Sequence, residues 1–253
     1  MQKHGDVLDL SEYIAESARQ REAHERGLAE AKGMSLEEYR AHVEAERERQ
    51  RVEADKRIAE QRRREVFAER SALLRASRVC VTSEDLEHLV RGDIRDTVAT
   101  KHVRKWADGI RDRVEKTPRF LLLCGGVGVG KTFAAALAIV ELGFGVAVRA
   151  PELGQRVDPW RHELKDGVQR LDLTQGLIVV DDLGTERADD SRFADAFARL
   201  VDERQASRYT LITTNLTRAL IRPRYGDRIA DRLNHSGLAI EIAGESMRKK
   251  GAL

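Results

Sequence analysis

From Phe120 to Leu142 the chain reads FLLLCGGVGVGKTFAAALAIVEL. An apolar run enters a glycine-rich segment, and an alanine-rich run that favours helix leaves it. The segment fits the phosphate-loop pattern G-x-x-x-x-G-K-[ST] at every position. Its residues are Gly125, Gly126, Val127, Gly128, Val129, Gly130, Lys131 and Thr132. The strand–loop–helix context and the Lys-Thr pair favour a nucleotide site over a structural glycine turn.

Each residue type in this loop suits the binding of phosphate. Glycines let backbone N–H groups turn inward around an anion, and the N-terminus of the following helix adds partial positive charge. We expect Lys131 to reach the β- and γ-phosphates of ATP and Thr132 to offer its hydroxyl to Mg²⁺.

A second apolar run ends in two carboxylates. Residues 177–182 read LIVVDD, which predicts a buried strand that delivers both acids at its carboxyl end, where open α/β sheets bind ligands. We expect Asp181 to hold Mg²⁺ through water and Asp182 to orient or deprotonate the attacking water. Alone, a strand ending in Asp-Asp is weak evidence, and the upstream phosphate loop is what favours the catalytic interpretation.

Two further segments carry candidate catalytic groups. Residues 210–215 read TLITTN, so a neighbouring strand would bring the amide of Asn215 near the γ-phosphate, although Asn also commonly initiates a turn. Residues 226–233 read GDRIADRL, which puts Arg228 and Arg232 on one helix face. Such arginines can stabilise the transition state in a neighbouring subunit, or they can belong to an ordinary surface helix with local Asp–Arg pairs.

The alternation of apolar and helical segments predicts an α/β fold with a parallel sheet. The expected strands are residues 120–124, 146–149, 177–181, 210–213 and 238–242. The expected helices are residues 93–114, 131–142, 190–205, 226–234 and a segment around 160–173.

The first part of the chain has a different composition, because it is highly charged and its apolar residues are sparse. One helix is expected over residues 10–32, ending at Gly33, and a second begins at Ser35, which has the capping-box spacing with Glu38. The sparse apolar residues fit no heptad, so the segment is predicted to be a solvated helical arm. We therefore expect a partner-binding arm over residues 1–78 and an ATPase domain over residues 79–253.

The composition bears on whether the chain binds nucleic acid, holds zinc, is exported or spans a membrane. The net charge of +2 gives no electrostatic argument for nucleic-acid binding, and Cys80 and Cys124 have no histidine partners at zinc-ligand spacing. The polar N-terminus lacks the apolar segment of a signal peptide, and the apolar runs are too short to span a bilayer. These features predict a cytoplasmic protein without membrane contact.

Taken together, these motifs resemble those of the DnaC-like helicase loaders and, equally, of the IstB-like transposase helper ATPases. The residues after the acid pair, Leu183 and Gly184, and the segment 244–248 also look like this group. The resemblance implies an AAA+ fold, ATP and Mg²⁺, and self-association with a composite ATP site. It also implies a partner bound through the N-terminal arm, either a DnaB-like replicative helicase or a transposase, with single-stranded DNA as a further candidate ligand. By this resemblance Asn215 is similar to the sensor-1 residue and Arg232, less closely Arg228, to the arginine finger.

Two departures from the wider AAA+ pattern affect these expectations. Asp182 stands where Glu is usual, and its shorter side chain predicts slow hydrolysis. Few residues follow the last strand, so no helical lid is expected, and Arg248 is a poor substitute for a sensor-2 arginine. The favoured function is an ATP-dependent helicase loader in DNA replication. A transposition helper, a small-molecule P-loop kinase and a nucleotide-bound scaffold that does not hydrolyse ATP are the alternatives.

Overall fold

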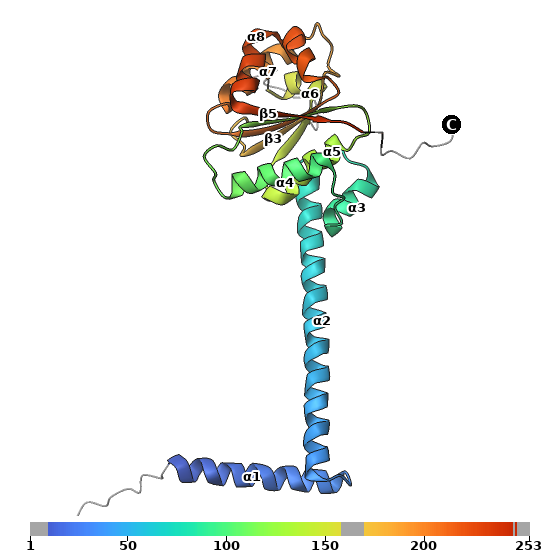
Figure 1. Cartoon of the computed structure of the whole chain (residues 1–253), viewed down its shortest axis with the longest axis vertical. Coiled ribbons are helices and arrows are strands. Elements are labelled where there is room, and N and C mark those ends of the chain that lie inside the picture. The colour runs from blue at the N-terminus through green and yellow to red at the C-terminus, as the bar shows by residue number, and fades with distance from the viewer. Residues whose placement is uncertain (1–9, 158–169, 245, 247–253) are drawn as a thin grey trace, which may run out of the picture. The chain divides into compact units, whose positions relative to one another are not determined.

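The computed structural model describes residues 10–157, 170–244 and 246 of the chain. The chain divides into two compact units, Met1–Arg64 and Glu65–Leu253. Figure 1 labels the helices and strands. The elements are α1 (Leu10–Ala31), α2 (Leu36–Ala76), α3 (Ser83–Arg91), α4 (Val98–Arg111), β1 (Phe120–Gly125), α5 (Lys131–Leu142), β2 (Val146–Arg149), α6 (Ala150–Val157), β3 (Leu177–Leu183), α7 (Ser191–Arg204), β4 (Tyr209–Thr214), α8 (Arg218–Ser236) and β5 (Gly237–Ile242).

The first unit contains α1 and most of α2, up to Arg64, and local interactions stabilise it. The predicted capping box is confirmed, because the Ser35 amide donates to Glu38 Oε2 at 2.8 Å and the Glu38 amide donates to Ser35 Oγ at 3.2 Å. Arg40 pairs with Glu25 at 2.8 Å and links the two helices. Ala29 is the buried apolar residue described in this unit, so the helices depend on capping and ion pairs rather than on a core.

The second unit contains a five-stranded parallel sheet in the order β2-β3-β4-β1-β5. The five strands lie where the sequence predicts them, and the parallel sheet of the predicted α/β fold is confirmed. The three inner strands are buried along nearly their whole length, because helices cover both faces of the sheet.

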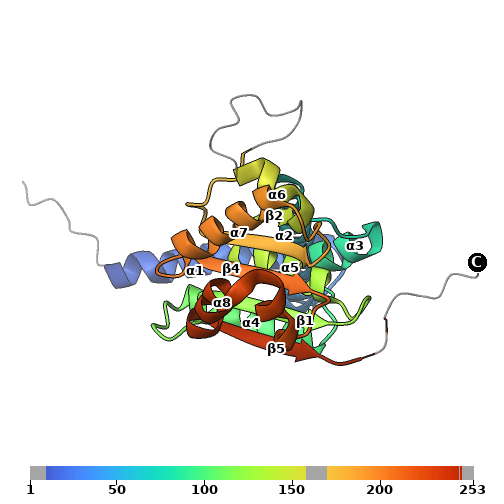
Figure 2. The same cartoon turned by 90° about the horizontal axis from the view of Figure 1, so that it is seen from above.

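Helices cover both faces of this sheet (Figures 1 and 2). Helices α4 and α5 pack on one face with Leu121, Leu123 and Val179, whereas α6, α7 and α8 pack on the other with Leu122 and Ile178. The strand register pairs Cys124 of β1 with Thr214 of β4, and Leu183 of β3 with the same threonine. The carboxyl ends of β1, β3 and β4 therefore meet at one edge of the sheet.

Three predicted helices differ from the observed ones. Helix α4 occupies Val98–Arg111 and not the predicted 93–114, because Thr97 caps it with Thr100 as a capping box. Helix α6 directly follows β2, whereas most of the segment predicted around 160–173 lies outside the described residues, and Arg170–Leu173 is not helical.

Helix α8 begins at Arg218, eight residues before the predicted start at Gly226. Pro223 and Gly226 indicate a boundary in the sequence, but here they mark a kink inside the element, where Gly226 has φ 84° and ψ 167°. The helix after the kink is the one that the sequence predicts.

The compact second unit begins at Glu65, before the predicted boundary at residues 78 and 79. Leu74, near the end of α2, is 2% exposed and packs in the same core cluster as α4 and α5. The chain between Glu65 and residue 78 therefore contributes to the core of the sheet-containing unit.

The expectations of no helical lid and of a weak role for Arg248 concern residues 245 and 247–253, which lie outside the described residues. Among the described helices, none combines the length and the apolar character that crossing a membrane requires.

Candidate functional site: a nucleotide cleft

The phosphate loop connects β1 to α5 at the carboxyl edge of the sheet. Gly128 has φ 83° and Gly130 has φ 87°, a left-handed conformation that favours glycine. A Cβ on Gly125 would lie 2.5 Å from the carbonyl oxygen of Ile242, so this glycine is required by the close approach of β5. Helix α5 begins at Lys131, and its N-terminus therefore points partial positive charge toward the loop.

Lys131 joins the loop to the end of β4. Lys131 is 6% exposed, and its ammonium group donates to the carbonyl oxygens of Gly125 and Gly126 at 2.8 and 2.6 Å. It also donates to Asn215 Oδ1 at 2.9 Å. Two predicted site residues that are 84 positions apart in the sequence are thus in direct contact.

Asp181 is the buried acid of the site, with 4% of its surface exposed. Its Oδ1 accepts a hydrogen bond from the Thr132 hydroxyl at 3.1 Å and another from the Thr213 hydroxyl at 2.6 Å. Burial raises the pKa of Asp181 above the ordinary value, while the bond from Thr213 acts in the opposite direction and the neighbouring charge of Asp182 raises it further. Hydroxyl and carboxylate oxygens are ligands that suit Mg²⁺.

Asp182 differs from Asp181 in backbone and exposure. It has φ 57°, a left-handed conformation that costs a non-glycine residue about 1–3 kcal/mol, and it lies where the β3–β4 register is irregular between Val180 and Leu183. Its amide donates to Thr213 Oγ1 at 2.9 Å, and its side chain is half-buried and lines a cleft. The Thr213 hydroxyl therefore contacts both the carboxylate of Asp181 and the backbone amide of Asp182.

Thr213 was not among the residues predicted from sequence to act in the site. The signal that could have identified it is its place on β4, directly beside the end of β3, but threonine is also an ordinary strand residue.

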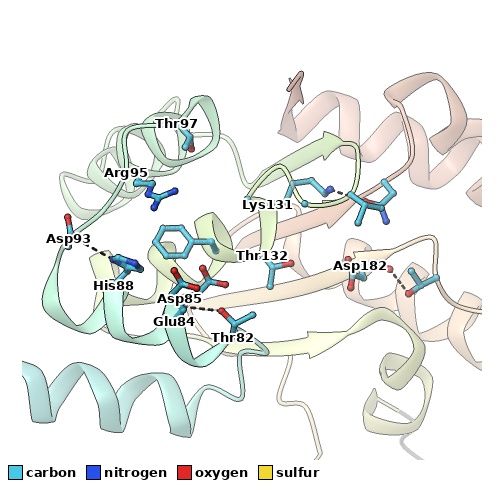
Figure 3. A pocket seen from close by; sticks show the side chains of 16 residues that line it. Thr82, Glu84, Asp85, His88, Asp93, Arg95, Thr97, Lys131, Thr132 and Asp182 are labelled. Atoms are coloured by element: carbon cyan, nitrogen blue, oxygen red, sulfur yellow. Dashed lines mark hydrogen bonds and ion pairs between the residues drawn. The ribbon is translucent and has the colours of Figure 1, made fainter. Parts of the chain in front are cut away.

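The cleft has a volume of about 470 Å³ and two walls (Figure 3). The wall formed by the phosphate loop and the strand ends includes Gly128, Gly130, Lys131, Thr132, Asp182, Thr185 and Asn215. The opposite wall comes from α3 and the segments around it, and it includes Thr82, Glu84, Asp85, His88, Asp93, Arg95 and Thr97. On this wall His88 Nδ1 lies 3.4 Å from Asp93 Oδ2. Sequence reasoning missed this second wall because α3 carries no residue pattern typical of nucleotide binding.

The two predicted arginines lie elsewhere, on α8 beyond the kink. Arg228 pairs with Asp202 Oδ2 of α7 at 2.7 Å, and Arg232 pairs with Oδ1 of the same carboxylate. Neither arginine occurs among the described residues that line the cleft. The structure therefore brings the phosphate loop, Asp181, Asp182 and Asn215 together and keeps Arg228 and Arg232 apart from them within one chain.

A family comparison agrees with this geometry. The family described as IstB-like ATP binding protein matches residues 14–253, which is nearly the whole chain. The chain belongs to this family. The resemblance to IstB-like ATPases that the motifs predict is thus confirmed.

This IstB-like chain is also similar to individual proteins. A protein of Sinorhizobium fredii (strain NBRC 101917 / NGR234), named as an insertion sequence ATP-binding protein, y4pL, is 31% identical over 141 residues. The match covers 51% of this chain and 56% of the relative, so the matched part spans about half the length of that curated protein.

Some solved structures are similar to part of this chain at low identity. The crystal structure of DnaI is 23% identical, with 66% of this chain and 94% of that chain covered and a TM-score of 0.48. AMPPCP-bound DnaA from Aquifex aeolicus is 14% identical, with 60% and 49% covered and a TM-score of 0.46.

Proposed function

We propose that the chain binds ATP with Mg²⁺ in the cleft and hydrolyses it slowly, as the ATP-controlled helper of an insertion sequence. The main observation in support of the nucleotide site is the contact between Lys131 and Asn215. It joins the phosphate loop to the end of a neighbouring strand at the cleft. The second link, from Thr132 to Asp181, joins the same loop to β3.

The residues present fit ATP and Mg²⁺. The left-handed glycines Gly128 and Gly130 shape the loop before the N-terminus of α5, which is where helices bind phosphate. Thr132 and Asp181 supply oxygen donors for Mg²⁺. When bound, Mg²⁺ would neutralise the negative charge that hydrolysis develops on the phosphate oxygens.

The remaining lining residues can be given roles in this proposal. Lys131 would exchange its contacts with loop carbonyls for contacts with phosphate, and Asn215 and the half-buried Asp182 would orient the attacking water. On the opposite wall, His88 is a planar group able to stack on a base. Phe133 also lines the cleft and offers a second flat surface.

The proposed macromolecular partner is a transposase. The family is IstB-like, and the relative from Sinorhizobium fredii is named for an insertion sequence. The sequence motifs also resemble DnaC-like loaders, so a DnaB-like replicative helicase is the alternative partner.

The N-terminal helices offer apolar anchors for such a partner. On α1 the side chains of Tyr13 and Ile14 are 63% and 60% exposed, and on α2 Val66 and Phe67 are 43% and 47% exposed. Adjacent apolar side chains exposed on otherwise polar helices are typical of binding surfaces. We propose that the predicted arm, residues 1–78, binds the partner through Tyr13 and Ile14, which lie in the first unit.

The experiment uses the full chain to capture two candidate partners, the transposase encoded beside it and the replicative helicase of the same genome. A Tyr13→Ala/Ile14→Ala variant should lose capture of the transposase while still binding ATP. Leu220→Ala, which changes a side chain 49% exposed on α8, is the matched control and should keep capture. Capture of the helicase and not the transposase would favour the loader, and capture of neither would contradict an adaptor function.

A further inference from the structure

Glu186 is a buried carboxylate outside the nucleotide cleft. It lies in the turn after β3, four residues beyond Asp182, and its side chain is 2% exposed. It is not among the described residues that line the cleft. A buried carboxylate is costly unless hydrogen bonds and an opposite charge compensate it, and both are present here.

One oxygen of Glu186 holds the turn that carries Asp182. The amide of Gly184 donates to Glu186 Oε2 at 2.8 Å. In the same turn the hydroxyl of Thr185 donates to the carbonyl oxygen of Asp182 at 2.7 Å. Asp182, which has the left-handed backbone, is thus directly followed by a turn that Glu186 stabilises through the amide of Gly184.

The other oxygen holds α8. Glu186 Oε1 accepts hydrogen bonds from Arg224 Nε and Nη2 at 3.0 and 2.8 Å and from the Tyr225 hydroxyl at 2.7 Å. Arg224 Nη2 also donates to the backbone oxygen of Glu186 at 2.9 Å. The ring of Tyr225 packs on Phe197 of α7 with 5.3 Å between centroids, which fixes the position of the hydroxyl.

The two donors on α8 immediately precede the kink at Gly226. Arg228 and Arg232 follow on the next turns of the helix, beyond this kink. If the turn after Asp182 moves, one of two things must therefore follow. Either the movement is transmitted to Arg224 and Tyr225 on α8, or hydrogen bonds of Glu186 break, which is costly because the site is buried.

We propose that Glu186 is a positioning residue that couples the turn after Asp182 to the half of α8 that carries Arg228 and Arg232. The inference rests on the proposed function, because nucleotide in the cleft is what would move or stabilise the turn. The coupling predicts that ATP bound in the cleft changes the stability of α8, although none of the described residues that line the cleft lies on α8.

The test is a Glu186→Gln variant of the full chain. Glutamine keeps the shape of the side chain, and its oxygen can still accept from Arg224 and Tyr225. Its NH₂ group then faces the amide of Gly184, so two donors oppose each other and the link to the turn is lost. Glu203→Gln is the matched control, since Glu203 is a partly exposed acid on α7 that pairs with Arg199 at 2.6 Å.

Amide hydrogen exchange is measured with and without Mg²⁺ and a non-hydrolysable ATP analogue. In the unchanged chain and in Glu203→Gln, the analogue should slow exchange in residues 125–133 and in residues 226–236. In Glu186→Gln it should still protect the phosphate loop and no longer protect α8.

Protection of α8 that persists in Glu186→Gln, or protection of the loop alone in the unchanged chain, would overturn the coupling. Absence of protection at the loop in the unchanged chain would contradict the nucleotide site itself, and the inference would fail with it.

Steady-state ATPase kinetics give a second readout. Glu186→Gln should lower kcat roughly tenfold and leave KM for ATP within about twofold, because catalysis is sensitive to small displacements of the reacting groups. A purely structural role would lower the melting temperature and leave kcat of the folded protein unchanged. If Glu186→Gln does not fold, Tyr225→Phe removes one helix-side bond and keeps the ion pair, and it should lower kcat in the same sense but by less. An unchanged kcat in the folded Tyr225→Phe variant would then overturn the proposal.

Discussion

The phosphate-loop edge of the sheet and the arginine-bearing half of α8 differ in what fixes their side chains. At the sheet edge, strand register sets the positions of the site residues, and Lys131 contacts Asn215 directly. On α8, Arg228 and Arg232 share one carboxylate of α7, that of Asp202. A motif at the ends of adjacent strands is thus assembled by the fold itself. A motif on a surface helix forms contacts with the nearest charge, and a role in catalysis requires a second chain.

The largest expected effect is at the sheet edge. Lys131→Ala removes the cation that bridges the loop and Asn215, so ATP hydrolysis should fall by roughly a hundredfold or more and ATP affinity should drop with it. Phosphate release and calorimetry measure the two losses, and Lys101→Ala on the exposed surface of α4 is the control. Unchanged affinity and turnover in a folded Lys131→Ala protein would remove the basis for the site.

Asp182 should separate binding from turnover. Asp182→Asn keeps the size of the side chain and removes the base, so we expect ATP binding close to that of the parent and turnover lower by roughly a hundredfold. Asp182→Glu extends the carboxylate by one methylene and should raise the rate of hydrolysis above that of the parent. Hydrolysis by Asp182→Asn at the parental rate would mean that another group activates water.

The proposed role of Arg232 of α8 in the site of a second chain is tested by mixing two variant chains. An Arg232→Ala chain has an intact loop, and a Lys131→Ala chain has an intact arginine, so a mixture should recover part of the ATPase that each lacks. The control mixture of Lys131→Ala with Asp182→Asn has no intact site and should stay inactive. Failure of the first mixture to recover activity at any ratio, with both proteins folded, would exclude a composite site that uses Arg232.

The sequence predicted the parts of the site that depend on strands and on the phosphate loop. Strand ends are predictable because apolar runs locate the strands and parallel packing aligns their carboxyl ends. It could not predict that Glu186 meets Arg224, because their contact spans 38 residues and depends on where α7 and α8 pack. Nor could it predict the start of α8, since Pro223 and Gly226 usually end a helix and here only kink it.

The smallest expected effect concerns stability at Asp181. Burial raises its pKa in the folded chain, so its contribution to stability is fully present below the unfolded-state pKa and is lost as the pH rises through the folded-state pKa. Asp181→Asn keeps an oxygen that can accept from Thr132 and Thr213 and removes the buried charge. At pH 7, without nucleotide, it should melt at the parental temperature or a few degrees above it.

The pH dependence of this difference provides the control. Thermal unfolding at neutral and at acidic pH should give a difference between Asp181→Asn and the parent that shrinks as the pH falls, because the parental carboxylate then becomes protonated. A variant that melts well below the parent at pH 7 would show that the charge of Asp181 stabilises the nucleotide-free fold.

The central claim, a magnesium-dependent ATP site in the cleft, is tested most directly by calorimetric titration of the full chain with ATP, first with Mg²⁺ and then with a chelator. The account predicts saturable binding of one ATP per chain, weakened by roughly tenfold or more when Mg²⁺ is removed, because Thr132 and Asp181 then have no metal to hold. Absence of saturable binding in the presence of Mg²⁺, or binding that is indifferent to the metal, would contradict it.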